Sequence, residues 1–117
     1  SVTFFVDEDG NSGKSWFCRY WLTNHMDDTQ ILSVGKRDDL AYAIDVTKSY
    51  FFFDIPRCNM EFMQYSVLES LKDQIIFCNK YQSKTKVFSK PVHVIVFCNE
   101  QPDFSKMTED RFMIKEI

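Results

Sequence analysis

A glycine-rich segment near the start of the sequence has the residue types that bind phosphate. Its members, in order, are Gly10, Asn11, Ser12, Gly13, Lys14 and Ser15. Glycines let the backbone turn so that several N–H groups and the start of a helix converge on phosphate oxygens. The lysine would neutralise the β- and γ-phosphates of a nucleotide, and the serine hydroxyl would complete the coordination of Mg²⁺. The segment therefore predicts a phosphate-binding loop.

One position of this loop departs from the full pattern. The pattern has a glycine five residues before Gly13, where this chain has Glu8, so the loop must begin without the conformational freedom of glycine. The alternative interpretation is a β-turn followed by a helix cap, because Gly-Lys-Ser tripeptides are common. The apolar strand expected before the loop and the helix expected after it favour phosphate binding.

A carboxylate at the end of an apolar run supplies the expected partner of the loop. Asp54 follows Tyr-Phe-Phe-Phe at 50–53, and Pro56 ends the run because proline cannot continue a strand ladder. We expect two adjacent parallel strands to direct Ser15 and Asp54 at one magnesium ion, although a solvated strand end would look the same. Ile55 stands where a second acid would orient the attacking water. The candidates for that role are Glu8, Asp9 and Glu61.

Two further side chains suit phosphoryl transfer. Asn99 ends a third apolar strand, so its amide would approach the γ-phosphate or the attacking water from the sheet edge where ligands of α/β proteins collect. The alternative role of Asn99 is that of a turn former before Pro102. Arg111 offers a guanidinium that would stabilise the transition state in a neighbouring subunit. The alternative role of Arg111 is a surface ion pair with Asp110 or Glu109.

The charge of the chain is unevenly distributed. The net charge is −3, yet residues 72–90 hold five lysines and one aspartate, so this window carries +4 and the remainder −7. An acidic body with one basic strip favours a local contact with an anion over a broad DNA-coating face. The alternative is a lysine-rich exposed hairpin that the lysines keep soluble.

Apolar runs and helical spacings predict an order of elements. We expect strands at 2–6, 50–53 and 92–98, a helix from Lys14 to a stop at 24–28, an apolar stretch at 31–34, a short helix at 36–44, the longest helix from Asn59 to about Phe77, a hairpin within 81–89 and a final apolar segment from Phe112. Strands that alternate with helices imply an α/β fold of three layers, with a mainly parallel central sheet flanked by helices. Residues 1–117 are expected to form one domain.

The composition excludes several classes of protein. The 117 residues are 44% hydrophobic and 26% charged, which suits one compact domain rather than a disordered chain. Apolar runs of about five residues are too short to cross a bilayer, and no basic segment leads an apolar stretch at the N-terminus. Cys18, Cys58, Cys78 and Cys98 lack metal-ligand spacing, so we interpret them as reduced core thiols from a reducing compartment.

Five segments in this order resemble a known family. They are DEDGNSGKS (7–15), YFFFDIPRC (50–58), LESLKDQIIFCNKY (68–81), HVIVFCNEQPD (93–103) and TEDRF (108–112). The set is similar to the helicase domain of replication-associated (Rep) proteins of circular single-stranded DNA viruses, nanovirus-like members above all. These domains are superfamily 3 helicases with the AAA+ version of the P-loop NTPase core. The resemblance covers nearly the whole chain and implies an ATP-driven ring helicase, usually hexameric, that unwinds DNA in rolling-circle replication.

The resemblance also implies roles for individual residues. The Walker A element corresponds to Gly10, Gly13, Lys14 and Ser15, the Walker B acid to Asp54, the sensor to Asn99 and the arginine finger to Arg111. Residues 80–90 correspond to the hairpin that faces the central channel in this family, which implies that Lys80, Lys84 and Lys86 contact single-stranded DNA, with Lys84 and Lys86 as the preferred phosphate contacts. Tyr81 and Phe88 would add base stacking; the alternative is that a hairpin aromatic is buried. Glu8 and the missing second Walker B acid put the rate of hydrolysis in question more than nucleotide binding.

The same resemblance bears on what surrounds the domain. The nuclease of a Rep protein needs a His-hydrophobe-His pair, and neither His25 nor His93 lies in one, so we expect a fragment without joining activity. Family members assemble through a segment before the first strand, which predicts a monomeric and slow isolated domain, and they act in the host nucleus. Two other classes share the loop: a small P-loop kinase, and a module that holds nucleotide and single strands without turnover.

Overall fold

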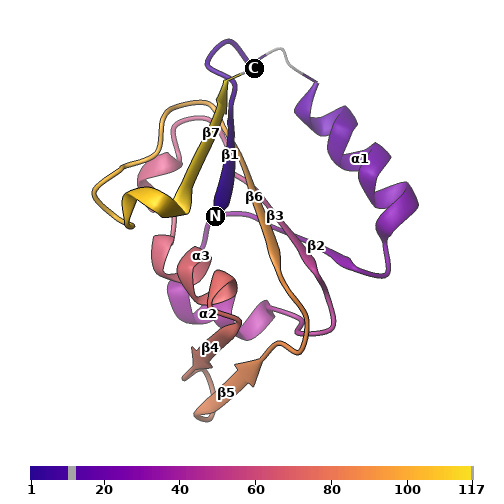
Figure 1. Ribbon diagram of the computed structural model, residues 1–117, viewed down its shortest axis with the longest axis vertical. Helices are drawn as coiled ribbons and strands as arrows, with labels where there is room; N and C mark the ends of the chain where they lie inside the picture. Colours follow the sequence, from indigo (N-terminus) through magenta and orange to yellow (C-terminus); the bar gives the residue numbers. More distant parts are fainter. Residues whose placement is uncertain (11–12, 117) are drawn as a thin grey trace.

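The structure is a computed structural model that describes residues 1–10 and 13–116, and of Ser15 the backbone only. Its elements in chain order are β1 (Val2–Val6), α1 (Lys14–His25), β2 (Thr29–Leu32), α2 (Arg37–Ala43), β3 (Tyr50–Asp54), the 3₁₀ turn η1 (Met60–Phe62), α3 (Tyr65–Lys72), β4 (Ile75–Cys78), β5 (Lys84–Val87), β6 (His93–Cys98), the 3₁₀ turn η2 (Glu109–Arg111) and β7 (Phe112–Glu116) (Figure 1). None of the described helices is long and apolar enough to cross a membrane.

A parallel sheet organises the molecule. Within the described residues it has five strands in the order β2-β3-β6-β1-β7, and each neighbouring pair runs parallel. The three central strands are continuous apolar runs, as expected for strands that are covered on both faces. The prediction of an α/β fold with a mainly parallel sheet is therefore confirmed.

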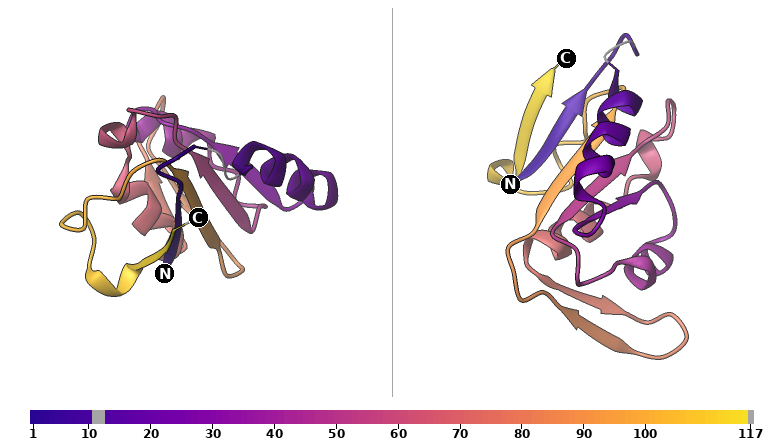
Figure 2. Two further views of the ribbon diagram at one scale, coloured as in Figure 1. Left: turned by 90° about the horizontal axis from the view of Figure 1, so that it is seen from above. Right: turned by 90° about the vertical axis from the view of Figure 1, so that its right-hand side faces the viewer.

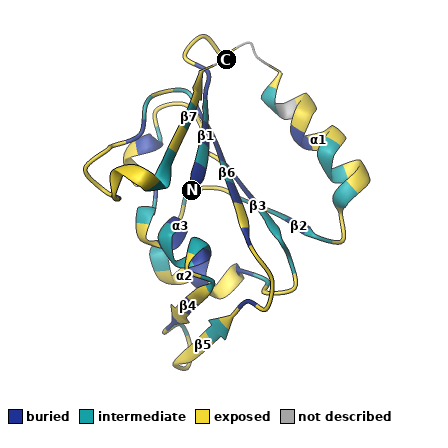
Figure 3. Cartoon of the chain, viewed as in Figure 1, coloured by how far each residue is buried: buried dark blue, intermediate teal, exposed yellow. Residues whose placement is uncertain are grey.

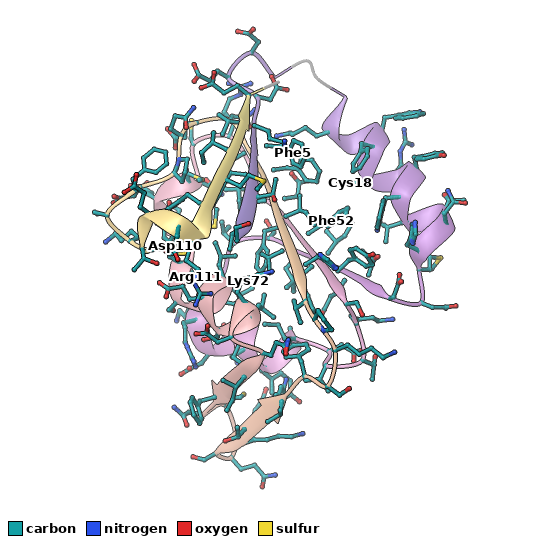
Figure 4. All side chains as sticks on the ribbon, in the orientation of Figure 1. Phe5, Cys18, Phe52, Lys72, Asp110 and Arg111 are labelled. Atoms are coloured by element: carbon teal, nitrogen blue, oxygen red, sulfur yellow. The ribbon has the colours of Figure 1, made fainter. Side chains whose placement is uncertain are left out.

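Helices cover both faces of the sheet, which gives three layers (Figures 1 and 2). On one face α1 packs through buried Cys18 against Phe52 and Phe97; Figure 4 shows Cys18 between the helix and the sheet. On the other face α2 and α3 form the larger core with the sheet, which includes Phe4, Leu40, Phe51, Val67, Leu68 and Leu71. The outer side of α1 remains exposed, whereas the central strands are largely buried (Figure 3).

The prediction of one long helix from Asn59 to Phe77 is wrong. The structure has the turn η1, then the eight-residue helix α3, and then strand β4. Gln74 adopts a φ of 65°, a left-handed conformation that ends the helix. The following Ile-Ile-Phe sequence favours a strand, and it pairs with β5 instead of continuing the helical spacing. The longest described helix is α1, with 12 residues.

The expected hairpin is present but begins earlier than predicted. Strands β4 and β5 pair antiparallel from Ile75 opposite Val87 to Cys78 opposite Lys84. They form a separate two-stranded sheet that projects at the end of the molecule opposite the loop after β1 (Figure 1). The expected apolar stretch at 31–34 is found as β2, two residues earlier, and the short helix is found as α2.

The four cysteines are all free, as predicted, but they are not all in the core. Cys18, Cys78 and Cys98 are buried, whereas Cys58 is exposed. Cys58 lies in a tight turn after β3, where the N–H of Asn59 donates to the carbonyl of Pro56 at 3.1 Å and Cys58 adopts a φ of 68°. The turn carries this side chain out of the core.

This difference predicts how the thiols react. Burial raises the pKa of Cys98 to about 11 and also raises the pKa of Cys18, so both thiols hold little reactive thiolate at pH 8. We expect one fast-reacting thiol per chain with a disulfide reagent, and three more only after unfolding in urea. Cys58→Ser should remove the fast phase. A fast phase that persists in this variant would contradict the assignment.

Candidate functional site

Three central strands end in polar side chains on the same face of the sheet. Each of these polar residues comes two positions after an aromatic residue whose ring packs towards α1. The pairs are Phe5 with Asp7, Phe52 with Asp54, and Phe97 with Asn99. Because alternate residues of a strand point to the same face, the three polar groups leave the sheet on the α1 side. The carboxyl ends of β1, β3 and β6 therefore form one polar edge next to the start of α1.

The strands that carry the loop and Asp54 are not adjacent, which corrects the expectation from the sequence. Strand β6 lies between β1 and β3 and pairs with both. The Asn99 side chain consequently occupies the middle of the edge. Its amide nitrogen donates to the carbonyl of Asp7 at 2.7 Å, and its oxygen accepts from the Lys14 ammonium at 3.3 Å. Asn99 thus joins the end of β1 to the first residue of α1.

The start of α1 has features that suit an anion. Gly13, the residue before the helix, has a φ of 82° and provides no side-chain cap, and no acidic residue lies in the first turn. Among the described residues, a Cβ at Gly13 would meet nothing within 4 Å, so the backbone there is open on the side of the described chain. Helix N–H groups without a cap attract phosphate. Asn11, Ser12 and the Ser15 side chain lie outside the described residues, and their phosphate and metal contacts stay predictions.

Asp7 is a site residue that the sequence analysis missed. Its side chain is 2% exposed, and one carboxylate oxygen accepts the N–H of Gly10 at 2.8 Å. Gly10 has a φ of 79°, so a buried acid and a left-handed glycine together shape the entry of the loop. The available signal was an aspartate at a strand end followed by a glycine-containing turn. Its neighbours Glu8 and Asp9, which the sequence analysis named as candidates, are exposed.

Asp54 lies at the same edge, and its charge and that of Lys14 both affect the pKa of the Cys18 thiol. Burial is the main cause that raises the pKa of the Cys18 thiol; Asp54 raises it further, and Lys14 lowers it. Because such effects weaken with distance, both charges lie near this one thiol. Asp54 is exposed, and its backbone carbonyl accepts from the Ser33 hydroxyl at 3.0 Å. In the described part of the chain, no group of three or more His, Cys, Asp or Glu side chains is placed to hold a metal.

Arg111 lies away from this edge. It precedes β7, whose first residue Phe112 pairs with Val2 at the start of β1, so it sits at the opposite end of the sheet strands. Its guanidinium binds Asp73 at 2.6 Å, rather than Asp110 or Glu109 as the ion-pair alternative predicted, and this bond raises the pKa of Arg111. Figure 4 shows Arg111 beside Lys72 on the side of the sheet away from α1. A role in the site of a neighbouring subunit stays a prediction.

The three lysines of the hairpin have different surroundings. Lys86 donates to the carbonyls of Ala41, Tyr42 and Ile44 at 2.7 to 2.9 Å, and so caps the end of α2. Lys80 forms an ion pair with Asp39 of the same helix. Lys84 is exposed and has no side-chain hydrogen bond or ion pair to any described residue. Lys84 and Lys86, the two phosphate contacts preferred from the sequence, therefore differ, because Lys86 and Lys80 already hold the hairpin to α2.

A groove separates the hairpin from the end of α2. It has a volume of about 720 Å³. Its lining includes Tyr42 and Tyr81, whose rings meet edge to face at 5.1 Å and which are 53% and 82% exposed, respectively. Phe88, the other ring considered for base stacking, is buried against Phe51, which agrees with the alternative that a hairpin aromatic is buried. The groove thus offers two exposed rings beside the free ammonium of Lys84.

Comparisons with known proteins show which family this chain resembles in sequence. The sequence model of the family described as RNA helicase matches residues 4–100. The chain is 44% identical over 115 residues to Para-Rep C1 of Milk vetch dwarf C1 alphasatellite, and 36% identical over 114 residues to Para-Rep C9 of Faba bean necrotic yellows C9 alphasatellite. Each alignment covers 97% of this chain and 40% of the relative, so the chain spans less than half of the curated relatives.

A solved structure shares the fold. The A form apo structure of the NrS-1 C-terminal region aligns with a TM-score of 0.65 at 12% identity, over 98% of this chain and 28% of that one. At this identity the likeness concerns the fold alone. The family match over most of the chain and the Para-Rep relatives show that the chain belongs to the RNA helicase family and is a Rep-like superfamily 3 helicase domain.

Proposed function

We propose that this domain is the ATP-driven motor of a viral Rep-type replication protein, which acts as a ring on single-stranded DNA during rolling-circle replication in the host nucleus. The observation that carries the proposal is the bond of Lys14 to Asn99 at an edge that also holds Asp7 and Asp54. In this arrangement the Lys14 ammonium, the Asn99 amide and the exposed carboxylate of Asp54 lie near the start of α1. These are the groups that phosphoryl transfer uses to position and stabilise charge.

Each group at the edge has a proposed task. Lys14 and the loop N–H groups hold the phosphates, Asn99 contacts the terminal phosphate, and Ser15 and Asp54 hold Mg²⁺. The exposed carboxylate of Asp54 and the backbone at Gly13, open on the side of the described chain, fit Mg·ATP. The ion would supply neutralisation of the charge on the β- and γ-oxygens. Arg111 would complete the site of the next subunit in the ring.

The hairpin groove is the proposed contact for single-stranded DNA. Exposed aromatic rings next to lysines bind unpaired strands because every base can stack on a ring and every phosphate attracts a cation. Tyr42 and Tyr81 provide the rings, and Lys84 provides the free cation. Lys80 and Lys86 contribute positive potential, while their ammonium groups hold the hairpin on α2. Hydrolysis would shift this hairpin along the strand.

The first test of the motor is Lys14→Ala. Loss of the ammonium removes charge stabilisation at the phosphates, so we expect the ATPase rate to fall by about 100-fold or more. The rate should be measured against protein concentration, with and without single-stranded DNA. Arg19→Ala, on the exposed surface of α1, is the control. A Lys14→Ala variant with the wild-type rate would contradict the proposal, as would a wild-type chain that binds Mg·ATP without turnover at every concentration.

The second test separates the two lysines of β5. Lys84→Gln should leave the free energy of unfolding unchanged, weaken binding to oligo-dT and lower the salt dependence of binding by about one phosphate contact. Lys86→Gln should lower the free energy of unfolding by about 1–3 kcal/mol, because three α2 carbonyls lose their partner. Urea unfolding and fluorescence anisotropy measure the two effects. The reverse pattern would show that the lysine roles are misassigned.

A further inference from the structure

A rigid turn directly after β3 carries an arginine. Ile55, which follows Asp54, is 1% exposed, and its N–H donates to the carbonyl of Phe97 at 2.9 Å. The next four residues close a turn through the bond from the Asn59 N–H to the Pro56 carbonyl, with Cys58 in a left-handed conformation. A left-handed non-glycine residue costs conformational energy and persists where its surroundings enforce it. Arg57 is therefore presented from a firmly held segment of the sheet edge.

The guanidinium of Arg57 lies against the candidate phosphate loop. A Cβ added at Gly10 would come within 2.2 Å of Arg57 Nη2 and 3.5 Å of its Cζ. The Arg57 guanidinium therefore lies directly beside Gly10. The φ of 79° favours glycine at position 10, whereas the flexible end of the arginine side chain can move to make room for a Cβ. The contact links the segment after β3 to the loop after β1, although β6 separates the two strands.

Arg57 differs from the other arginines of the chain. Arg111 is paired with Asp73 at the far end of the strands, and Arg37 binds Asp38 and the Phe77 carbonyl. Arg19 lies on the exposed side of α1. Arg57 makes no hydrogen bond or ion pair with any described side chain; the residue is exposed, and its guanidinium lies beside Gly10 of the loop. A free guanidinium offers five N–H donors in a geometry that matches phosphate oxygens.

We propose that Arg57 binds the terminal phosphates of the nucleotide within the same subunit. This inference rests on the proposed function of the loop. Asp54, which would hold magnesium near the terminal phosphates, ends the same strand three residues before Arg57. Arg57 therefore reaches the loop from the side of the β- and γ-phosphates. Lys14 approaches from the start of α1, so one cation from a helix start and one from the turn after β3 would bracket the triphosphate.

The test compares nucleotides as well as variants. Mg·ATP and Mg·ADP are titrated calorimetrically into the wild-type chain, Arg57→Gln, Arg57→Lys and the control Arg19→Gln. We expect Arg57→Gln to weaken Mg·ATP about 10- to 100-fold and Mg·ADP several-fold less. Arg57→Lys should recover part of the difference, because a lysine supplies the charge without the fork of donors. Arg19→Gln should bind both nucleotides as the wild type does.

The outcomes distinguish this inference from the proposal on which it rests. If Arg57→Gln loses affinity for ATP and ADP equally, or loses none, the proposed role of Arg57 is overturned. The proposal of nucleotide binding would still stand in that case, because the wild-type affinity tests it separately. A wild-type chain that binds neither nucleotide would overturn both. Urea unfolding of Arg57→Gln provides the structural control, because a merely structural role would lower the free energy of unfolding without changing the preference for ATP over ADP.

Discussion

The two hydrogen bonds of the Asn99 side chain connect the parts of the candidate site. The end of β1 and the first residue of α1 are joined across this amide, which β6 carries between β1 and β3. A lysine at the start of a helix has a long and flexible side chain, and a fixed amide oxygen holds it over the sheet edge. The strand order is thus a functional constraint, since a different order would remove Asn99 from the centre.

The same sheet separates two regions with different physical character. The loop after β1 and the hairpin β4–β5 lie at opposite ends of the molecule (Figure 1). Helix α2 connects the two regions. The segment between β2 and α2 contacts Asp54 through Ser33, and Lys86 of the hairpin caps the far end of α2. The bond from the Ser33 hydroxyl to the Asp54 carbonyl lies before α2 begins, and Lys80 of the hairpin region pairs with Asp39 in the first turn of α2.

Local patterns in the sequence predicted the loop, the strand-end groups and the hairpin, because each depends on a short run of residues. The strand order was not accessible in that way, since it depends on packing between distant segments. The spacing of Met63, Val67, Leu71 and Ile75 suggested a continuing helix, yet the left-handed Gln74 ends it. The cap that Lys86 places on α2 and the contact of Arg57 with Gly10 join residues more than 40 positions apart. Only the folded chain shows them.

The central claim is that a triphosphate binds at the carboxyl edge of the sheet, and at 13.9 kDa the chain is small enough for NMR to test it residue by residue. Amide resonances should be followed while a non-hydrolysable Mg·ATP analogue is added. The account predicts the largest shifts at Gly10, Gly13 and Lys14, together with the side-chain amide of Asn99. Shifts confined to the hairpin groove, or no shifts at saturating analogue, would contradict it.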